Sequence, residues 1–179
     1  MEVPWEQGIR HGEDVNVDNA FRLVCDCVDE LEKNGIKYWF NWGLLLGAVR
    51  NKGFIPYDTD HDITVHWEDR EKIWNIIEPA MIAKGCVVPP KEVCFPEDRF
   101  FIRDLEKIEL NFVEDRGDKY TYSPNRCPLG CQKRFLDKLD TIEFYGRKFT
   151  IPSFAEEYLE KSYGSDWRVP IKGKKPRSL

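Results

Sequence analysis

The sequence predicts an α+β fold, a single domain in which a small mixed β-sheet is flanked by helices. Helical periodicity dominates the start of the folded region, whereas β-branched and aromatic runs fill its centre. The chain has 179 residues, of which 41% are hydrophobic and 33% charged, as in one globular domain. We expect an irregular segment over residues 1–16, the folded domain over 17–170 and a basic tail over 171–179.

Four segments carry helical signals. Apolar residues at helical spacing predict amphipathic helices over residues 17–33 and 68–84. A leucine-rich run that opens with glycine predicts a short helix over residues 43–50. Ser153 is expected to cap a last helix, which ends near residues 163–164.

Strand signals fall between these helices. The predicted strands cover residues 36–40, 63–67, 99–103 and 108–113, with a hairpin over 141–151 that turns at Tyr145-Gly146. In the fourth strand, Glu109 and Asn111 should face away from the apolar Ile108, Leu110 and Phe112. Residues 105–107 are predicted to be a tight connection and residues 119–130 a loop.

Charge and hydropathy limit the possible partners. The net charge is −5 and the pI is about 5.4, so nucleic acid is not an expected partner. No apolar run approaches the ~18 residues of a membrane span, and the acidic N-terminus does not resemble a signal peptide. We therefore expect a soluble, cytoplasmic protein, or one in the Golgi lumen if this chain is a fragment of an anchored protein.

The cysteines leave three alternatives open. The sequence has six cysteines, and Cys127 and Cys131 flank a Pro-Leu-Gly turn. This pair could form half of a Zn²⁺ site or a disulfide in a loop. A chain of this length folds without disulfides, so free thiols are the third alternative.

The run from residue 58 to 62 carries the strongest chemical signal. Asp58, Asp60 and Asp62 alternate, so on an extended backbone they point to one side, about 6.5 Å apart. Carboxylates at this spacing repel each other unless a cation or a proton relieves the repulsion. Oxygen ligands of this kind suit Mg²⁺ or Mn²⁺. His61 should point the opposite way and take a structural role.

Glu109 is the third element of this predicted site. It lies on a separate strand between apolar residues, where a carboxylate must be paired, bind a metal or face solvent. Two acids from one strand and one from a neighbouring strand can hold divalent ions against a nucleotide's phosphates. The alternative is that Glu109 simply faces solvent.

Two glycines and two cations are predicted to contact the substrate. Gly43 and Gly47 precede the acids and could let backbone amides approach a phosphate closely. Arg50 and Lys52 could neutralise donor phosphates, or they could be surface charges.

A calcium-binding EF-hand loop also opens with alternating aspartates, but it does not fit here. That loop needs glycine at its sixth position and glutamate at its twelfth. Counted from Asp58, these positions hold Ile63 and Asp69.

The residues Gly43-Leu-Leu-Leu-Gly-Ala-Val-Arg50 and Gly53-Phe-Ile-Pro-Tyr-Asp-Thr-Asp-His-Asp62 closely resemble the signature of the LicD family. Residues 108–112 and the tail from Tyr163 to Pro170 also look like this family, which includes bacterial phosphocholine transferases and the animal proteins fukutin and fukutin-related protein. The resemblance covers about residues 18–170.

The resemblance implies a nucleotidyltransferase-like fold and a Mg²⁺-dependent transfer of phosphocholine or ribitol phosphate. The donor would be CDP-linked and the acceptor a hydroxyl of a sugar or glycan. By matching positions, Asp60, Asp62 and Glu109 would hold the metal, and Asp58 would lie behind these ligands or assist the donor directly. In the mechanism we expect, Asp58 could also accept the proton of the acceptor hydroxyl. Leu44 departs from the hydroxylic residue that is common after the first glycine, and Glu109 replaces a common Asp.

Two other functions remain open. One is a nucleotidyltransferase that attaches NMP to a small molecule, and the other is a non-catalytic binding module, which Leu44 would favour. Four aromatic side chains are candidates to line the acceptor groove, with a core role expected for at least half of them: Trp39, Trp42, Tyr57 and Trp167.

Overall fold

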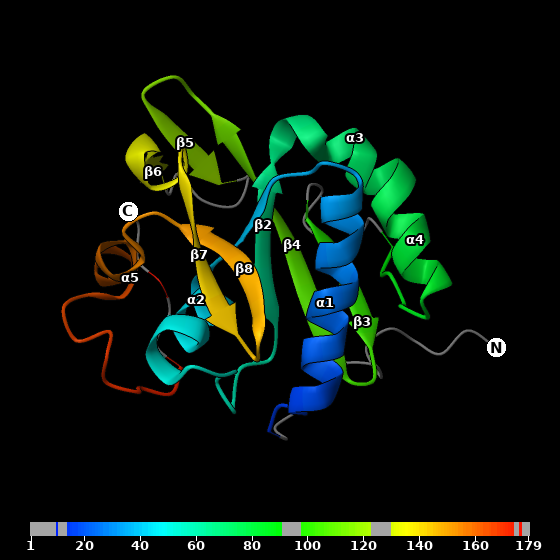
Figure 1. Cartoon of the computed structure of the whole chain (residues 1–179), viewed down its shortest axis with the longest axis horizontal. Coiled ribbons are helices and arrows are strands. Elements are labelled where there is room, and N and C mark those ends of the chain that lie inside the picture. Colours follow the sequence, from blue (N-terminus) through cyan, green and yellow to red (C-terminus); the bar gives the residue numbers. More distant parts are fainter. Residues whose placement is uncertain (1–9, 11–13, 91–97, 123–129, 174–175, 177–179) are drawn as a thin grey trace.

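The computed structural model describes residues 10, 14–90, 98–122, 130–173 and 176. Most of the predicted irregular segment 1–16 and part of the predicted tail 171–179 therefore lie outside the described residues. The rest forms a mixed sheet flanked by helices, which confirms the predicted α+β class. Figure 1 shows α1 lying across β4, with α4 beside it, and α2 and α5 beyond β2.

The helical segments follow the predicted order. The α-helices are α1 (Val17–Lys33), α2 (Trp42–Leu46), α3 (Arg70–Lys72), α4 (Glu78–Ala83) and α5 (Ala155–Tyr163). The helix predicted over residues 68–84 is a succession of short pieces, in which a π-helical turn at Ile73–Ile77 joins α3 to α4. A second π-helical turn, Gly47–Asn51, extends α2 to the end of the predicted helix 43–50.

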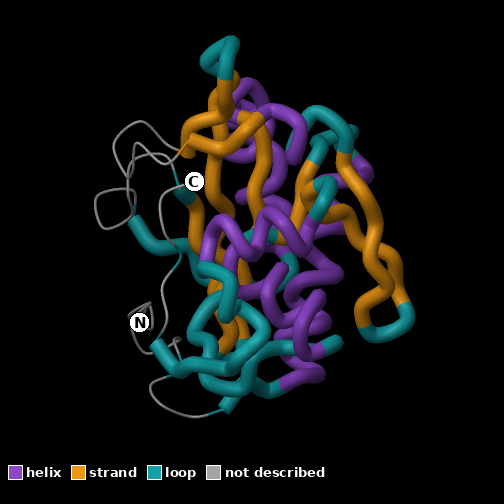
Figure 2. Tube along the Cα trace, turned by 90° about the vertical axis from the view of Figure 1, so that its left-hand side faces the viewer, coloured by secondary structure: helices purple, strands orange, loops and turns teal. Residues whose placement is uncertain are grey.

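The strands form two sheets. They are β1 (Tyr38–Phe40), β2 (His61–His66), β3 (Arg99–Arg103), β4 (Glu106–Asp115), β5 (Lys119–Tyr122), β6 (Gly130–Gln132), β7 (Leu139–Phe144) and β8 (Arg147–Pro152). The main sheet has the order β1-β2-β4-β5-β6, with β3 also paired to β4, and only β2 and β4 run parallel. Figure 2 shows two groups of strands, the main sheet and the β7–β8 hairpin.

Three local predictions were wrong. Residues 119–130 are not a loop throughout, because β5 buries Tyr120 and Tyr122 and pairs with both β4 and β6. The strand is only four residues long and alternates polar Lys119 and Thr121 with the two tyrosines, so its sequence pattern is too short to predict a strand. Ser153 does not cap α5: its hydroxyl donates to the carbonyl of Lys138, and Phe154 occupies the cap position.

The third error lies between β3 and β4. The connection is the pair Asp104-Leu105, whose φ values are 53° and 67°, and β4 already begins at Glu106. The predicted hairpin turn at Tyr145-Gly146 is confirmed, with φ values of 49° and 79°. Positive φ at both central residues is typical of the tight turns that match the twist of a hairpin.

The two faces of β2 and β4 differ in character, as the alternation in 108–113 predicted. In the parallel pair, Asp62 lies opposite Glu109 and Thr64 opposite Asn111, so polar residues share one face. The other face carries fully buried Ile63, Val65 and Leu110, and it packs under α1. The fold thereby places a hydrophobic core behind the strands and a polar wall in front of them.

Within the described part of the chain, no helix combines the length and apolar character that crossing a bilayer requires. Cys131 is a buried free thiol, and burial raises its pKa to about 12. Its predicted partner Cys127 lies outside the described residues, so the Zn²⁺ site stays a prediction. Cys25, Cys27 and Cys86 are also free thiols, in line with the third alternative, free cysteines.

Candidate active site

The acidic run leads from a turn into the central strand. The backbone N–H of Asp58 donates to the carbonyl of Ile55 at 3.0 Å, and β2 begins at His61. Asp62 is therefore the second residue of a strand that is hydrogen-bonded on both sides, to β1 and to β4. This placement holds its carboxylate on a rigid element next to Glu109.

A cavity of about 540 Å³ opens in front of these strands. All four predicted carboxylates line it, and a fifth joins them: Asp58, Asp60, Asp62, Glu109 and Asp98. The structure therefore brings the run at 58–62 and the separate strand residue Glu109 together, as the sequence predicted. A concave site with convergent charged groups is the usual form of a ligand pocket.

Asp62 is the most constrained of these acids. Its side chain is buried, and burial, with the charges of Asp60, Glu109 and Asp58, raises its pKa well above the ordinary value. The amide of Asn111 lies 3.4 Å from Oδ1 of Asp62, and the backbone N–H of Gly43 also donates to this carboxylate. Negative charge at this point is costly unless a cation balances it.

Gly43 makes room for Asp58. A β-carbon on Gly43 would lie 2.1 Å from Oδ2 of Asp58, a distance no pair of atoms tolerates. Gly43 also lines the cavity, where it admits one carboxylate and donates to another, and its predicted approach to a phosphate stays a prediction. The glycine is thus part of the acidic site itself.

Of the other three residues predicted to contact the substrate, one lines the cavity and two do not. Arg50 lines the cavity, and its guanidinium donates to the carbonyl of Trp167 at 3.2 Å. Gly47 and Lys52 are not among the lining residues. A β-carbon on Gly47 would lie 2.7 Å from the carbonyl oxygen of Gly53, so this glycine permits a close crossing of two chain segments. The site proposed below leaves Gly47 and Lys52 out.

Aromatic side chains form much of the remaining wall. Of the four predicted groove residues, Trp42, Tyr57 and Trp167 line the cavity, whereas Trp39 is fully buried in the core. Trp39 is the middle residue of a three-residue strand that is buried throughout, which explains its different place. Leu44 is also a core residue, 2% exposed and absent from the lining.

Several lining residues were not predicted from the sequence: Asp98, Asn111, Tyr122, Tyr163 and Lys172. Asn111 could have been found, because it follows Glu109 on the same face of the strand. The others come from segments whose approach depends on tertiary packing. Tyr122, for example, lies in a network in which the amide of Asn41 donates to its hydroxyl at 3.0 Å and the hydroxyl of Tyr158 lies 2.6 Å away.

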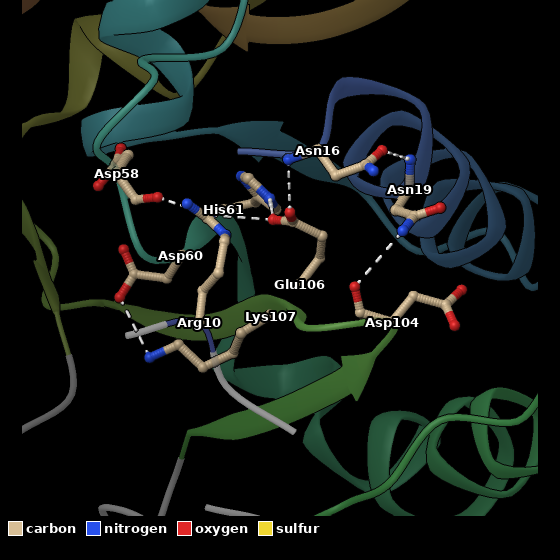
Figure 3. Close-up of polar contacts among 9 residues, drawn as sticks. All are labelled: Arg10, Asn16, Asn19, Asp58, Asp60, His61, Asp104, Glu106 and Lys107. Atoms are coloured by element: carbon tan, nitrogen blue, oxygen red, sulfur yellow. Dashed lines mark hydrogen bonds and ion pairs between the residues drawn. The ribbon is translucent and has the colours of Figure 1, made fainter. Parts of the chain in front are cut away.

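Behind the acidic loop lies a further carboxylate, that of Glu106, which is fully buried (Figure 3). Glu106 accepts a hydrogen bond from Arg10 at 3.0 Å and lies 3.0 Å from Nε2 of His61. The N–H of Asn16 donates to its other oxygen at 2.9 Å, and Arg10 also donates to the carbonyl of Asp58 at 2.6 Å. The predicted structural role of His61 is confirmed, because it points away from the acids and supports their loop.

The electrostatics of Glu106 match this role. Burial alone would raise its pKa, but the hydrogen bonds from His61 and Asn16 and the charge of Arg10 hold the pKa below the ordinary value. Glu106 is therefore a buried anion with partners on every side. The sequence predicts a tight connection at residues 105–107 and so gives no sign of a buried Glu106.

Carboxylate oxygens are suitable ligands for a hard divalent cation. However, a lysine contacts two of these carboxylates. The ammonium of Lys107 lies 3.2 Å from Oδ2 of Asp60 and 3.8 Å from Oε2 of Glu109. Among the described residues, no group of three or more His, Cys, Asp or Glu side chains is positioned to hold an ion. The carboxylate oxygens fit Mg²⁺ or Mn²⁺ in their chemistry, and the ammonium of Lys107 lies between Asp60 and Glu109.

Comparison with known proteins places this site in a family. A family model described as LicD/FKTN/FKRP, nucleotidyltransferase domain, matches residues 35–153. An uncharacterized protein of Rickettsia typhi is 51% identical over 148 residues, covering 79% of this chain and 46% of the relative. Human ribitol-5-phosphate transferase FKTN is 26% identical over 162 residues, covering 86% of this chain and 34% of that protein.

The lipopolysaccharide cholinephosphotransferase LicD of Haemophilus influenzae is 32% identical over 62 residues, 35% of this chain and 21% of that protein. The chain thus spans about half or less of the length of these curated relatives. The antibiotic-resistance factor ANT(2'')-Ia has a similar structure, with a TM-score of 0.56 at 14% identity, over 88% of this chain and 77% of that one. The lincosamide adenylyltransferase LnuA gives 0.51 at 14% identity, over 77% and 83%. These structures show a nucleotidyltransferase fold.

Proposed function

Because this chain belongs to the LicD/FKTN/FKRP family of nucleotidyltransferase domains, we propose that it transfers a phospho-alcohol group from a CDP-linked donor to a hydroxyl of a sugar or glycan. Phosphocholine and ribitol phosphate are the groups that the names of two relatives suggest. The observation that carries the proposal is the placement of Asp62 and Glu109 on one face of a parallel strand pair, at the wall of a cavity shared with Asp58 and Asp60.

The size and the lining of the cavity support such a donor. Its volume of about 540 Å³ suits a ligand of nucleotide size. Trp42 and Tyr57 provide ring faces on which a base or a sugar can stack. Arg50 and Lys172 line the same cavity and can pair with the pyrophosphate, whose charge the acidic wall alone would repel.

The acidic wall requires a cation to accept a pyrophosphate. Asp60, Asp62 and Glu109 would hold Mg²⁺ or Mn²⁺, with carboxylate oxygens as the ligands these ions prefer. When bound, the ion supplies positive charge that stabilises the phosphoryl oxygens. Asn111 donates toward Asp62 and keeps its carboxylate turned to the cavity.

The reaction needs an acceptor hydroxyl in line with the phosphorus–oxygen bond that breaks. The hydroxyl oxygen forms a bond to the distal phosphorus of the donor, the bond to the bridging oxygen breaks, and CMP leaves. Asp58 would take the hydroxyl proton, a role supported by its position in the cavity wall beside Gly43. Arg50 stabilises the charge that develops on the leaving CMP.

The fold favours one alternative reaction. LnuA, which has a similar fold, is named as an adenylyltransferase, so this chain could instead transfer NMP from a nucleoside triphosphate. That reaction releases pyrophosphate in place of CMP. A non-catalytic module, by contrast, loses its sequence argument, because Leu44 lies in the core and its side chain leaves the cavity wall unchanged.

A thermal-shift and calorimetric screen tests the choice of donor. CDP-choline, CDP-ribitol, CDP-glycerol and nucleoside triphosphates are added separately, each with and without Mg²⁺. We expect a CDP-linked compound to stabilise the protein in the presence of Mg²⁺ and to lose this effect in Asp62→Asn. Stabilisation by triphosphates alone supports NMP transfer, and stabilisation by none of these compounds contradicts both enzymatic proposals.

A further inference from the structure

Lys107 contacts two residues of the acidic site, although it is not among the residues that line the cavity and nothing in the proposed reaction uses it. It is the second residue of β4 and stands two positions before Glu109, so the two side chains share one face of the strand. Its ammonium lies 3.2 Å from Asp60 and 3.8 Å from Glu109, and Figure 3 shows the first of these contacts. Only 13% of the side chain is exposed.

A third group of the described residues lies next to this ammonium. The Nζ atom lies 4.8 Å from the centre of the Phe100 ring, within the range of a cation–π contact. Phe100 is on β3, where it is the register partner of Glu109. The ammonium is therefore held by a carboxylate before β2, a carboxylate on β4 and a ring on β3.

These contacts have an electrostatic consequence for the site. Asp60 and Glu109 are also two of the groups whose charges act on Asp62. A positive charge between Asp60 and Glu109 reduces the repulsion among all three carboxylates. A divalent ion held by the same two carboxylates must compete with this charge, because two cations bound so close together repel each other.

We propose that Lys107 is a tethered cation that positions Asp60 and Glu109 before substrate binds and releases at least one of them to an incoming divalent ion. The positioning role concerns the metal-free protein, whereas the exchange rests on the proposed function. Lys107 acts through the carboxylates and is a positioning residue. Its ammonium keeps the two acids from separating while no ion is bound.

The positioning role is tested by a double-mutant cycle in the metal-free protein. Lys107→Met keeps the length of the side chain and removes its charge, and we expect a Tm lower by about 2–4 °C. In an Asp60→Asn/Glu109→Gln background the same substitution should cost little, because the charges that it balanced are gone. Equal losses in both backgrounds would overturn the positioning role.

The exchange is tested by titration with Mn²⁺, followed through the paramagnetic resonance signal of the free ion. We expect Lys107→Met to bind Mn²⁺ about three- to tenfold more tightly than the wild type, although it is less stable. Lys107→Arg should stay close to the wild type. Lys72→Met is the matched control, because Lys72 pairs with Asp69 at 2.9 Å beyond the opposite end of β2.

Opposite changes in stability and in Mn²⁺ affinity distinguish the exchange from a merely structural role of Lys107. A lysine that only supports the fold would lower stability and Mn²⁺ affinity together, so weaker or unchanged binding by Lys107→Met overturns the exchange. If neither the wild type nor any variant binds Mn²⁺, the metal in the proposed function and the exchange both fail. A coupled double-mutant cycle would in that case still support the positioning role.

Discussion

Asp62 on β2 and Glu109 on β4 are register partners in the one parallel strand pair of the described sheet. Two acids that are far apart in the sequence therefore lie side by side at the cavity wall. Both are buried, and they share this face with Asn111. The pairing explains why a strand residue between apolar neighbours carries a carboxylate.

Asp62→Asn should separate activity from stability. We expect the transfer rate to fall at least about 100-fold, because a charged group at the reacting centre is lost. The free energy of unfolding should rise by about 1 kcal/mol, because the substitution removes one of several crowded negative charges. Urea unfolding and a transfer assay measure the two effects. Asp140→Asn, at an exposed position of β7, is the control and should change neither.

Gly43→Ala should damage the site through Asp58. The new β-carbon would lie 2.1 Å from Oδ2 of Asp58, so the carboxylate or the loop must move. We expect activity to fall about tenfold or more and stability to fall by about 1–3 kcal/mol. Adding Asp58→Ala removes the clash, so the double variant should regain most of the stability. A double variant as unstable as the sum of its parts would contradict this cause.

Arg50 and Lys52 provide a matched pair of cations. Arg50 lines the cavity and Lys52 does not. Arg50→Ala should raise the KM for the donor about tenfold, as expected for the loss of a charge-assisted contact with phosphate. Lys52→Ala should leave kcat and KM within a factor of about two. Steady-state kinetics of the two variants measure this difference. Equal effects on KM would contradict a contact between Arg50 and the donor.

The lowered pKa of Glu106 predicts that the protein loses stability in acid. Its pKa is lowered in the folded protein, so the unfolded chain binds more protons when the pH falls through the range of that group. Its contribution is therefore present above the ordinary value of about 4.3 and is lost as the pH drops below it. Glu106→Gln should cost about 1–3 kcal/mol at pH 7 and should reduce the difference in stability between pH 7 and pH 3. An unchanged pH dependence in urea unfolding would contradict the role of Glu106.

The sequence predicted the site wherever periodicity was sufficient. The alternation of Asp58, Asp60 and Asp62 placed them on one face and His61 on the other, and the structure agrees for His61. The same alternation separated Glu109 from Ile108 and Leu110. These inferences use only the direction of side chains on an extended strand, which the sequence determines.

The sequence could not show contacts between segments. The shared partners of Glu106 are residues 10, 16 and 61, and no local pattern connects them. Lys107 was missed because a turn was expected there. The role of Gly47 also depends on which atoms approach it, so spacing alone could not show that it permits a close crossing of two chain segments. Trp39 and Leu44 became core residues for the same reason, because burial depends on what packs over them.

The central claim is that the cavity transfers a phospho-alcohol from a CDP-linked donor, and phosphorus NMR of the products tests it most directly. The protein is incubated with Mg²⁺, a sugar acceptor and each CDP-linked donor, in parallel with Asp62→Asn. We predict that the resonance of CMP grows with the wild type while that of the donor's pyrophosphate disappears, and that Asp62→Asn forms no CMP. Equal CMP formation by Asp62→Asn, or release of pyrophosphate from nucleoside triphosphates in place of any CMP, would contradict the claim.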